Sequence, residues 1–304
     1  MASFCRALIV FVATLACTTT GERRRPDDDA HRYDGPVIDV HTHVFFDGQS
    51  GGLPGLDGSP AGVLAAAEAP RVARVGVIVM APRPGIAATR ALNDRLAAFV
   101  QTTPTRLFGI GTVHPADGAD AIAELSRFPA LGIRMLKLHP NTQGFDLASP
   151  EVNAVVAAAG QVGLPVLLDF SGLFQAQDLG KYLMLAVKNP KSKLILAHMG
   201  GTRFHELLVL TALREHGSYA NNVWVDLSAV AHLYADSPYR DQLVHVIRRL
   251  GTDRVLFASD FPFDRTPAQA MADVHALGLT AAEERQIFHD NAAALLGFDS
   301  GETP

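Results

Sequence analysis

Two histidines separated by one residue, His41 and His43, have the residue type and spacing best suited to metal chemistry in this sequence. They follow an apolar run at 37–40, and in a β-strand residues i and i+2 point to the same face. Two imidazoles that project together make half of a transition-metal site. A pair of surface or hydrogen-bonded histidines is the alternative. The rest of the chain favours the metal interpretation, because ionisable residues also follow later apolar runs.

Four later apolar runs end in residues that can ligate a metal, transfer a proton or bind an anion. These residues are Lys137 and His139, Asp169, His198, and Asp260. Lys137 and His139 repeat the i, i+2 spacing, so they also share one face of their strand. A single ionisable residue at a strand end is common, but five strands that each carry one are not.

Short apolar, β-branched runs alternate with segments rich in Ala and Leu from residue 37 onward. The predicted strands are 37–44, 75–80, 107–113, 133–138, 165–170, 193–198, 223–228 and 255–260. The predicted helices include 89–100, 119–127, 151–161, 176–187, 206–216 and 240–250. Eight units over roughly 250 residues predict an α/β fold, a (β/α)8 TIM barrel with its active site at the carboxyl ends of the strands. A doubly wound open sheet is the competing fold, but it usually has fewer units and a glycine-rich turn after its first strand.

The order of these motifs resembles the amidohydrolase superfamily, and within it the amidohydrolase-related branch. That branch contains metal-dependent hydrolases and metal-dependent decarboxylases of aromatic or muconate-type acids. The resemblance runs from about residue 37 to 298. Its motifs are the first His-Thr-His, Lys-Leu-His-Pro at 137–140, Leu-Ala-His-Met-Gly-Gly at 196–201, Ser-Asp-Phe-Pro at 259–262 and His-Asp-Asn-Ala at 289–292.

The resemblance implies one divalent metal ion held by His41, His43 and Asp260, with His198 beside the water or substrate at the metal. Zn²⁺ is the preferred ion, and Mn²⁺ and Fe²⁺ are alternatives. Such an ion activates water near neutral pH and polarises the bond to be broken. Asp260 is expected both to ligate the ion and to accept a proton from that water, so Asp260 and His198 are the predicted catalytic residues.

One departure from the branch concerns Asp169, which stands where the branch normally has a histidine ligand in a Leu-Pro-Val-Leu context. We predict that Asp169 is a fourth metal ligand, in a shell that favours harder ions such as Mn²⁺ more than an all-imidazole site does. A hydrogen-bond partner that orients a histidine is the second interpretation. A degenerate site that has lost one ligand is the third.

Lys137 and His139 are the predicted substrate-binding residues. In some members of the superfamily a lysine at this strand is carbamylated and bridges two metals, whereas here contact with a substrate carboxylate is preferred. A turn role for His139 stays open because Pro140 follows it. Asp39, one layer deeper than His41, and Asp226, on the seventh predicted strand, are further candidates for residues near the site.

The predicted activity is that of a metal-dependent hydrolase, which attacks a C–N or C–O bond of a small substrate with metal-activated water. Non-oxidative decarboxylation of a small unsaturated or aromatic acid is the enzymatic alternative. A non-catalytic, envelope-anchored binding protein is the second alternative, and the exchange at Asp169 is the feature that permits it. The expected partner is a small molecule. Dimers are common among such barrels, so a homodimer is also considered.

The composition limits the other classes of partner. The 304 residues carry 26 Lys and Arg against 31 Asp and Glu, a net charge of −5, which with no basic stripe argues against a nucleic-acid partner. Both cysteines, Cys5 and Cys17, lie in the first 17 residues. Any metal site in the rest of the chain must therefore use nitrogen and oxygen ligands, which excludes thiolate zinc and iron–sulfur centres.

The amino terminus predicts export. Residues 1–17 resemble a secretory signal peptide, with an apolar core at 7–13 followed by small residues. Leu-Ala-Cys at 15–17 is similar to a lipoprotein processing site, although Thr14 stands where such sites usually have leucine. Residues 18–34 are charge-dense and predict a disordered tether, and 35–300 the barrel. We expect a periplasmic or envelope protein, with lipid anchoring through Cys17, cleavage without lipidation and a mis-assigned start as open alternatives.

Overall fold

The computed structural model describes residues 32–47, 55–171, 178–217 and 219–298. The predicted leader at 1–17 and residues 18–31 of the predicted tether lie outside the described residues. Tyr33, in the last part of that tether, lies on the barrel: its backbone N–H donates to Glu284 at 2.9 Å, and its carbonyl accepts from the Arg71 guanidinium at 2.7 Å. Among the described residues, no helix has the length and apolar character needed to cross a membrane.

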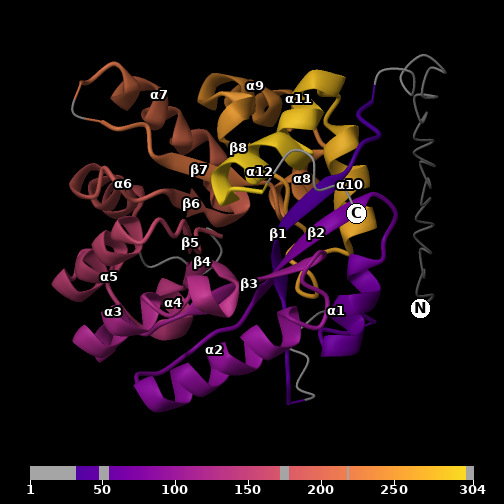
Figure 1. The fold of residues 1–304 in the computed structure, drawn as a ribbon. Helices are drawn as coiled ribbons and strands as arrows, with labels where there is room; N and C mark the ends of the chain where they lie inside the picture. Colours follow the sequence, from indigo (N-terminus) through magenta and orange to yellow (C-terminus); the bar gives the residue numbers. More distant parts are fainter. Residues whose placement is uncertain (1–31, 48–54, 172–177, 218, 299–304) are drawn as a thin grey trace, which may run out of the picture. The chain divides into compact units, whose positions relative to one another are not determined.

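Eight parallel strands follow one another around a barrel in the order of the sequence, which confirms the predicted fold (Figure 1). They are β1 (Val37–His43), β2 (Val72–Ile78), β3 (Leu107–Thr112), β4 (Ile133–Leu138), β5 (Val166–Leu168), β6 (Leu194–Leu196), β7 (Val223–Asp226) and β8 (Val255–Leu256). The chain just after β8 closes the barrel against β1. There the Val40 N–H donates to the Phe257 carbonyl at 3.2 Å, and the Asp260 N–H donates to the His41 carbonyl at 2.8 Å.

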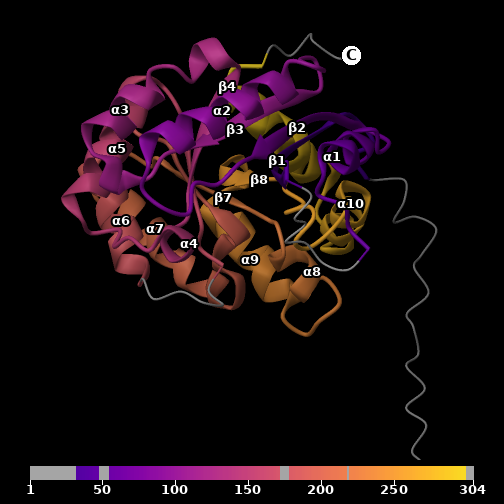
Figure 2. The ribbon, with the colours of Figure 1, turned by 90° about the horizontal axis from the view of Figure 1, so that it is seen from below.

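Helices surround these strands, as the view from below shows (Figure 2). They are α1 (Pro60–Ala67), α2 (Ile86–Val100), α3 (Ala119–Leu125), α4 (Pro140–Gln143), α5 (Pro150–Gln161), α6 (Leu179–Lys188), α7 (Val209–Arg214), α8 (Val230–Tyr234), α9 (Arg240–Leu250), α10 (Pro267–Ala276), α11 (Ala281–Arg285) and α12 (Asn291–Leu296). Local signals place several of them. The Ser149 side chain accepts from the Val152 N–H at the start of α5, with Pro150 in its first turn. The buried residues of α9 recur every three or four positions, as expected for a helix with one face on a sheet.

The barrel interior is filled with apolar side chains at its amino-terminal end. This cluster contains Ile38, Val40, Ile78, Ile110, Met135, Leu167, Ile195 and Leu256, together with residues of α12. The Phe298 ring adds an edge-to-face contact with Phe108, at 5.3 Å between ring centroids. Because this end is closed by apolar packing, the ionisable side chains gather at the other end, where the strands finish.

β4 has the predicted bounds, whereas β5 to β8 are shorter than predicted. After β6 and β8 the backbone leaves the extended conformation at the functional residues. His198 has φ 59° and Asp260 has φ 53°, the left-handed region that side chains other than glycine rarely adopt. After β6 the chain turns through Ala197–Leu208, where a non-helical kink at 198–201 precedes irregular 3-10 turns that replace the first part of the helix predicted at 206–216. Strain of this kind is concentrated at functional sites in proteins.

Candidate metal centre

Three donor atoms from two neighbouring strand ends lie within reach of one ion. The Nε2 atoms of His41 and His43 are 3.3 Å apart, and Asp260 Oδ1 lies 3.3 Å and 3.2 Å from them. Ligand atoms at the usual Zn–N and Zn–O distances in a tetrahedral site are about 3.3 Å apart, so this triangle fits a divalent ion. All three residues are buried. The donor set of two imidazoles and one carboxylate suits Zn²⁺, Mn²⁺ and Fe²⁺ alike.

Asp39 joins the two segments that carry these donors. Its Oδ1 accepts the backbone N–H of His41 and of Ser259, both at 3.1 Å, so it ties β1 to the turn that presents Asp260. Asp39 is fully buried, and burial raises its pKa to about 6. The sequence placed Asp39 one layer below His41, and the structure shows that it supports the backbone rather than a ring nitrogen.

Burial and neighbouring charges favour neutral histidines and an ionised carboxylate in the triangle. Burial, with Lys137 nearby, lowers the pKa of His41 to about 4, and burial also lowers the pKa of His43. Burial opposes ionisation of Asp260, but the imidazoles of His41, His43 and His198 outweigh it and hold the Asp260 pKa below its usual range. Neutral imidazole and carboxylate are the protonation states that bind a metal.

His198 and Asp169 form a second pair beside the triangle. His198 Nε2 lies 3.3 Å from Asp169 Oδ1, and the ring centroids of His198 and His41 are 5.1 Å apart. Burial disfavours the imidazolium, but hydrogen bonding to Asp169 and the charges of Asp260 and Asp226 raise the pKa of His198 to about 9. The other oxygen of Asp169 is buried and accepts no hydrogen bond, with His139 Nδ1 at 3.7 Å. Among the described residues, Asp169 belongs to neither of the two groups that can share one ion, and it faces His198 instead.

Lys137 and His139 both reach the site from the end of β4. The Lys137 ammonium is buried with its Nζ 3.2 Å from His41 Nε2, and burial lowers the pKa of Lys137. His139 is partly exposed, and its Nδ1 accepts the Thr142 N–H at the start of α4, so it also has the turn role that Pro140 suggested.

Sequence reasoning gave little weight to Asp226 and overlooked two further residues. The fully buried Asp226 contacts the ring of His41 and the backbone of His198, and Ser228 contacts the ring of His198. The i, i+2 spacing of Asp226 and Ser228 is a signal that could have identified them as a pair. Phe263 packs edge-to-face on His43 at 4.8 Å between ring centroids and is 38 % exposed, so it forms part of the rim. Its only sequence signal is its place just after the Ser-Asp-Phe-Pro motif.

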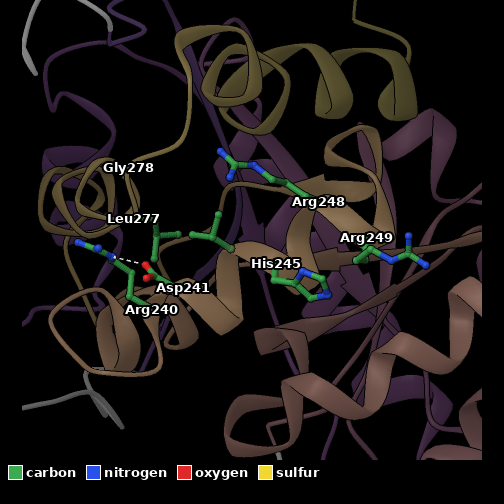
Figure 3. A pocket seen from close by; sticks show the side chains of 8 residues that line it. Arg240, Asp241, His245, Arg248, Arg249, Leu277 and Gly278 are labelled. Atoms are coloured by element: carbon green, nitrogen blue, oxygen red, sulfur yellow. Dashed lines mark hydrogen bonds and ion pairs between the residues drawn. The ribbon is translucent and has the colours of Figure 1, made fainter.

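A cavity of about 420 Å³ lies away from this chemistry, between α9 and the turn at Leu277 and Gly278 (Figure 3). Arg240, Arg248 and Arg249 border it, but their guanidinium groups point in different directions. Arg240 pairs with Asp241 at 3.1 Å, and Arg248 pairs with Glu283 at 2.7 Å. The arginines therefore do not converge on a common ligand.

Comparison with known proteins agrees with this geometry. The sequence profile of the family described as Amidohydrolase matches residues 38–298. The chain therefore belongs to the amidohydrolase family, as the resemblance of its motifs predicted.

Solved structures with the same fold include decarboxylases and a protein provisionally described as a hydrolase. The 2,6-dihydroxybenzoate decarboxylase from Rhizobium has a TM-score of 0.69 at 18% identity, over 88% of this chain and 100% of that chain. The 5-carboxyvanillate decarboxylase from Novosphingobium aromaticivorans was solved in complex with manganese and 4-hydroxy-3-methoxy-5-nitrobenzoic acid. It has a TM-score of 0.65 at 18% identity, over 87% of this chain and 96% of that chain. A protein from Pseudomonas putida, provisionally described as a 2-pyrone-4,6-dicarboxylic acid hydrolase, has a TM-score of 0.65 at 23% identity, over 87% of this chain and 98% of that chain. At these identities the likeness concerns the fold alone.

Proposed function

We propose that this chain is a metal-dependent hydrolase that cleaves a C–N or C–O bond of a small anionic or cyclic substrate. The observation that carries the proposal is the triangle of His41, His43 and Asp260, whose donor atoms lie 3.2–3.3 Å from one another. When bound there, a divalent ion supplies Lewis acidity and lowers the pKa of water toward neutrality.

Asp260 and His198 are the proton-transfer residues of this proposal. Asp260 is an ionised carboxylate at the triangle, so it accepts the proton of the attacking water through its carboxylate oxygen. His198, whose pKa is raised to about 9, is protonated at neutral pH and can donate from Nε2 to the leaving group. One group held ionised and one held protonated is the arrangement that acid–base catalysis at neutral pH requires.

Lys137 and His139 are the proposed contacts for an anionic group of the substrate. Lys137 lies near the end of β4 and His139 follows that strand. Because Lys137 is buried, an anion that reaches it is shielded from water. Phe263 adds an apolar wall at the rim, 4.8 Å from the His43 ring between centroids. A compact acid with one planar or cyclic face fits these surroundings.

The role of Asp169 in this proposal is that of a partner for His198. Its Oδ1 lies 3.3 Å from His198 Nε2, and the hydrogen bond raises the pKa of that histidine. The orphaned Oδ2 keeps the alternative of a fourth metal ligand open to experiment. Elemental analysis separates the two: about one metal per chain in both the parent and Asp169→Ala supports the partner role. Metal in the parent and much less in Asp169→Ala makes Asp169 a ligand.

Decarboxylation is the second candidate, because two of the matched structures are named as decarboxylases of aromatic acids. The metal-loaded protein should be incubated with lactones, amides and small aromatic acids, while product masses and released CO₂ are measured. Addition of water to the substrate without CO₂ supports the hydrolase, and CO₂ release in stoichiometry with product replaces it by the decarboxylase. A folded parent that takes up neither Zn²⁺ nor Mn²⁺ contradicts both and supports the binding-protein alternative.

A further inference from the structure

We propose that Asp226 is a positioning residue that sets the ring protons of two histidines at once, His41 on β1 and His198 after β6. The carboxylate stands at the end of β7, and the two oxygens of Asp226 are directed to different partners. The consequence for metal binding rests on the proposed function, whereas the consequence for the ring protons does not.

The first arm runs from Asp226 to His41. Asp226 Oδ2 lies 3.0 Å from His41 Nδ1, and both side chains are buried. An ionised carboxylate only accepts hydrogen bonds, so the His41 ring must carry its proton on Nδ1. The lone pair of a neutral His41 is then on Nε2, the atom that faces His43 and Asp260. A carboxylate behind a metal-binding histidine fixes ring orientation and increases ligand basicity.

The second arm runs from Asp226 through Ser228 to His198. Asp226 Oδ1 accepts the Ser228 hydroxyl at 2.5 Å and the His198 backbone N–H at 2.8 Å. Because the single hydroxyl proton of Ser228 is directed to the carboxylate, its oxygen must accept from His198 Nδ1, which lies 2.9 Å away. His198 therefore carries a proton on Nδ1, and the proton on its Nε2 is directed to Asp169, which lies 3.3 Å away.

A direct role of Asp226 as a metal ligand fits these contacts less well. Asp226, His41 and His198 form a group whose donor atoms are close enough to share an ion. However, both Asp226 oxygens are already engaged, by the His41 ring on one side and by Ser228 and the His198 backbone on the other. Ligation would break one arm and leave its buried donor without a partner, which is costly.

Single substitutions can disrupt the hydrogen bonds of the two arms separately. Asp226→Asn preserves the shape but places an amide against both arms, whereas Ser228→Ala removes only the hydroxyl that links Asp226 to the His198 ring. Asp253→Asn, the same change at an exposed carboxylate in the turn before β8, is the matched control. Ring-proton positions are read from ¹⁵N-histidine NMR spectra of the full chain, Mn²⁺ affinity from calorimetric titration, and folding from urea unfolding.

In the parent and in Asp253→Asn, both His41 and His198 should show a protonated Nδ1. Asp226→Asn should change the pattern of His41 and weaken Mn²⁺ binding about 10- to 100-fold. Ser228→Ala should shift the Nδ1–H resonance of His198 only, because that proton loses its acceptor, and should leave Mn²⁺ affinity within about 3-fold. An unprotonated Nδ1 on either ring of the parent overturns the proposal, as does Ser228→Ala weakening Mn²⁺ binding as much as Asp226→Asn.

The same data separate this proposal from the proposed function. If the parent binds no Mn²⁺ yet shows both Nδ1 protons, the assignment of Asp226 stands and the metal-dependent activity falls. If Asp226→Asn does not fold, the parent spectrum and Ser228→Ala decide the outcome. An unaltered His198 pattern in Ser228→Ala then counts against the second arm.

Discussion

In the proposed function Asp260 has two tasks, because its carboxylate lies against both β1 histidines and its pKa is held below its usual range. Its backbone is held at φ 53°, and its N–H donates to the His41 carbonyl at 2.8 Å, so its position depends on β1. A residue that both ligates and accepts a proton can lose the second task while keeping part of the first. That separation makes Asp260 the most informative single substitution.

We expect Asp260→Asn to lower turnover by about 100-fold or more while about one metal per chain is retained. The amide oxygen can still complete the triangle with His41 and His43, but an amide does not accept the proton. Turnover is measured with the substrate found by screening, and metal by elemental analysis. The double variant His41→Ala with His43→Ala is the comparison and should lose the metal. Normal turnover in either variant contradicts the assigned site.

The turn after β6 is the element that sets the direction of His198, and it depends on Gly201. Gly201 has φ 54° and ψ −119°, and a Cβ there would stand 2.1 Å from the Ser171 carbonyl oxygen. Gly118, before α3, has nearly the same backbone, φ 56° and ψ −123°, but nothing lies within 4 Å of a Cβ. The two glycines therefore separate backbone strain from collision.

Gly201→Ala should be destabilised more than Gly118→Ala. Both variants share the cost of a side chain in a region that favours glycine, about 1–3 kcal/mol. Gly201→Ala adds the displacement of the Ser171 backbone, about 1–3 kcal/mol more, as for other overpacked sites. Urea unfolding at neutral pH measures both free energies. Equal losses in the two variants would show that the approach to Ser171 is not tight in solution.

The contact between α9 and α11 gives the barrel wall a pH dependence. Glu283 receives two hydrogen bonds from the Arg248 guanidinium, at 2.7 Å and 3.0 Å, and caps α11 through Thr280. The hydrogen bonds from Arg248 lower the pKa of Glu283 from 4.5 to about 2. A depressed pKa in the folded state means that the stabilisation is complete above pH 4.5 and is lost as the pH falls toward 2.

We expect Glu283→Gln to lower the free energy of unfolding by about 1 kcal/mol at pH 6.5, the scale of a well-formed surface ion pair, and by much less at pH 3. The loss shrinks because acid protonates Glu283 in the unfolded chain more readily than in the folded one, so the parent loses the same stabilisation. Urea unfolding at the two pH values measures it. Glu215→Gln, the same change at an exposed position just after α7, should show no such trend. A pH-independent loss would assign the effect to capping alone.

At the scale of the molecule, a metal at the carboxyl ends of the strands would hold together β1 and the segment after β8, the place where the barrel closes. The Asp260 N–H to His41 carbonyl bond and the parallel bridge between Thr42 and Phe261 lie at this seam. A ligand that binds only the folded barrel stabilises it by mass action.

Removal of metal should therefore lower the melting temperature of the whole barrel. At a free metal concentration about 100 times Kd the stabilisation is about 2.7 kcal/mol, which raises the melting temperature of a chain of this size by about 5 °C. Calorimetric melting curves are compared before and after chelation and after Zn²⁺ or Mn²⁺ is restored. The His41→Ala, His43→Ala double variant should melt at the same temperature in all three conditions, and a chelation effect that persists in it would place the metal elsewhere.

Local patterns in the sequence were sufficient for the barrel and for most candidates at its mouth. Alternation of apolar strands with helical segments is read over a few residues, and so is the i, i+2 spacing that places His41 beside His43 and Lys137 beside His139. Strand ends were less accurate at β6 and β8, since the backbone turns there to present His198 and Asp260.

Only the tertiary structure decided which side chains face one another across the barrel. Contacts such as Lys137 with His41 and Asp226 with His41 join residues 96 and 185 positions apart, and they depend on how the strands are staggered when the sheet closes. The same closure turns Asp169 toward His198 and makes Asp226 a shared partner of two histidines. A strand pattern states which face a residue occupies, but the neighbour it meets is set by the geometry of the whole barrel.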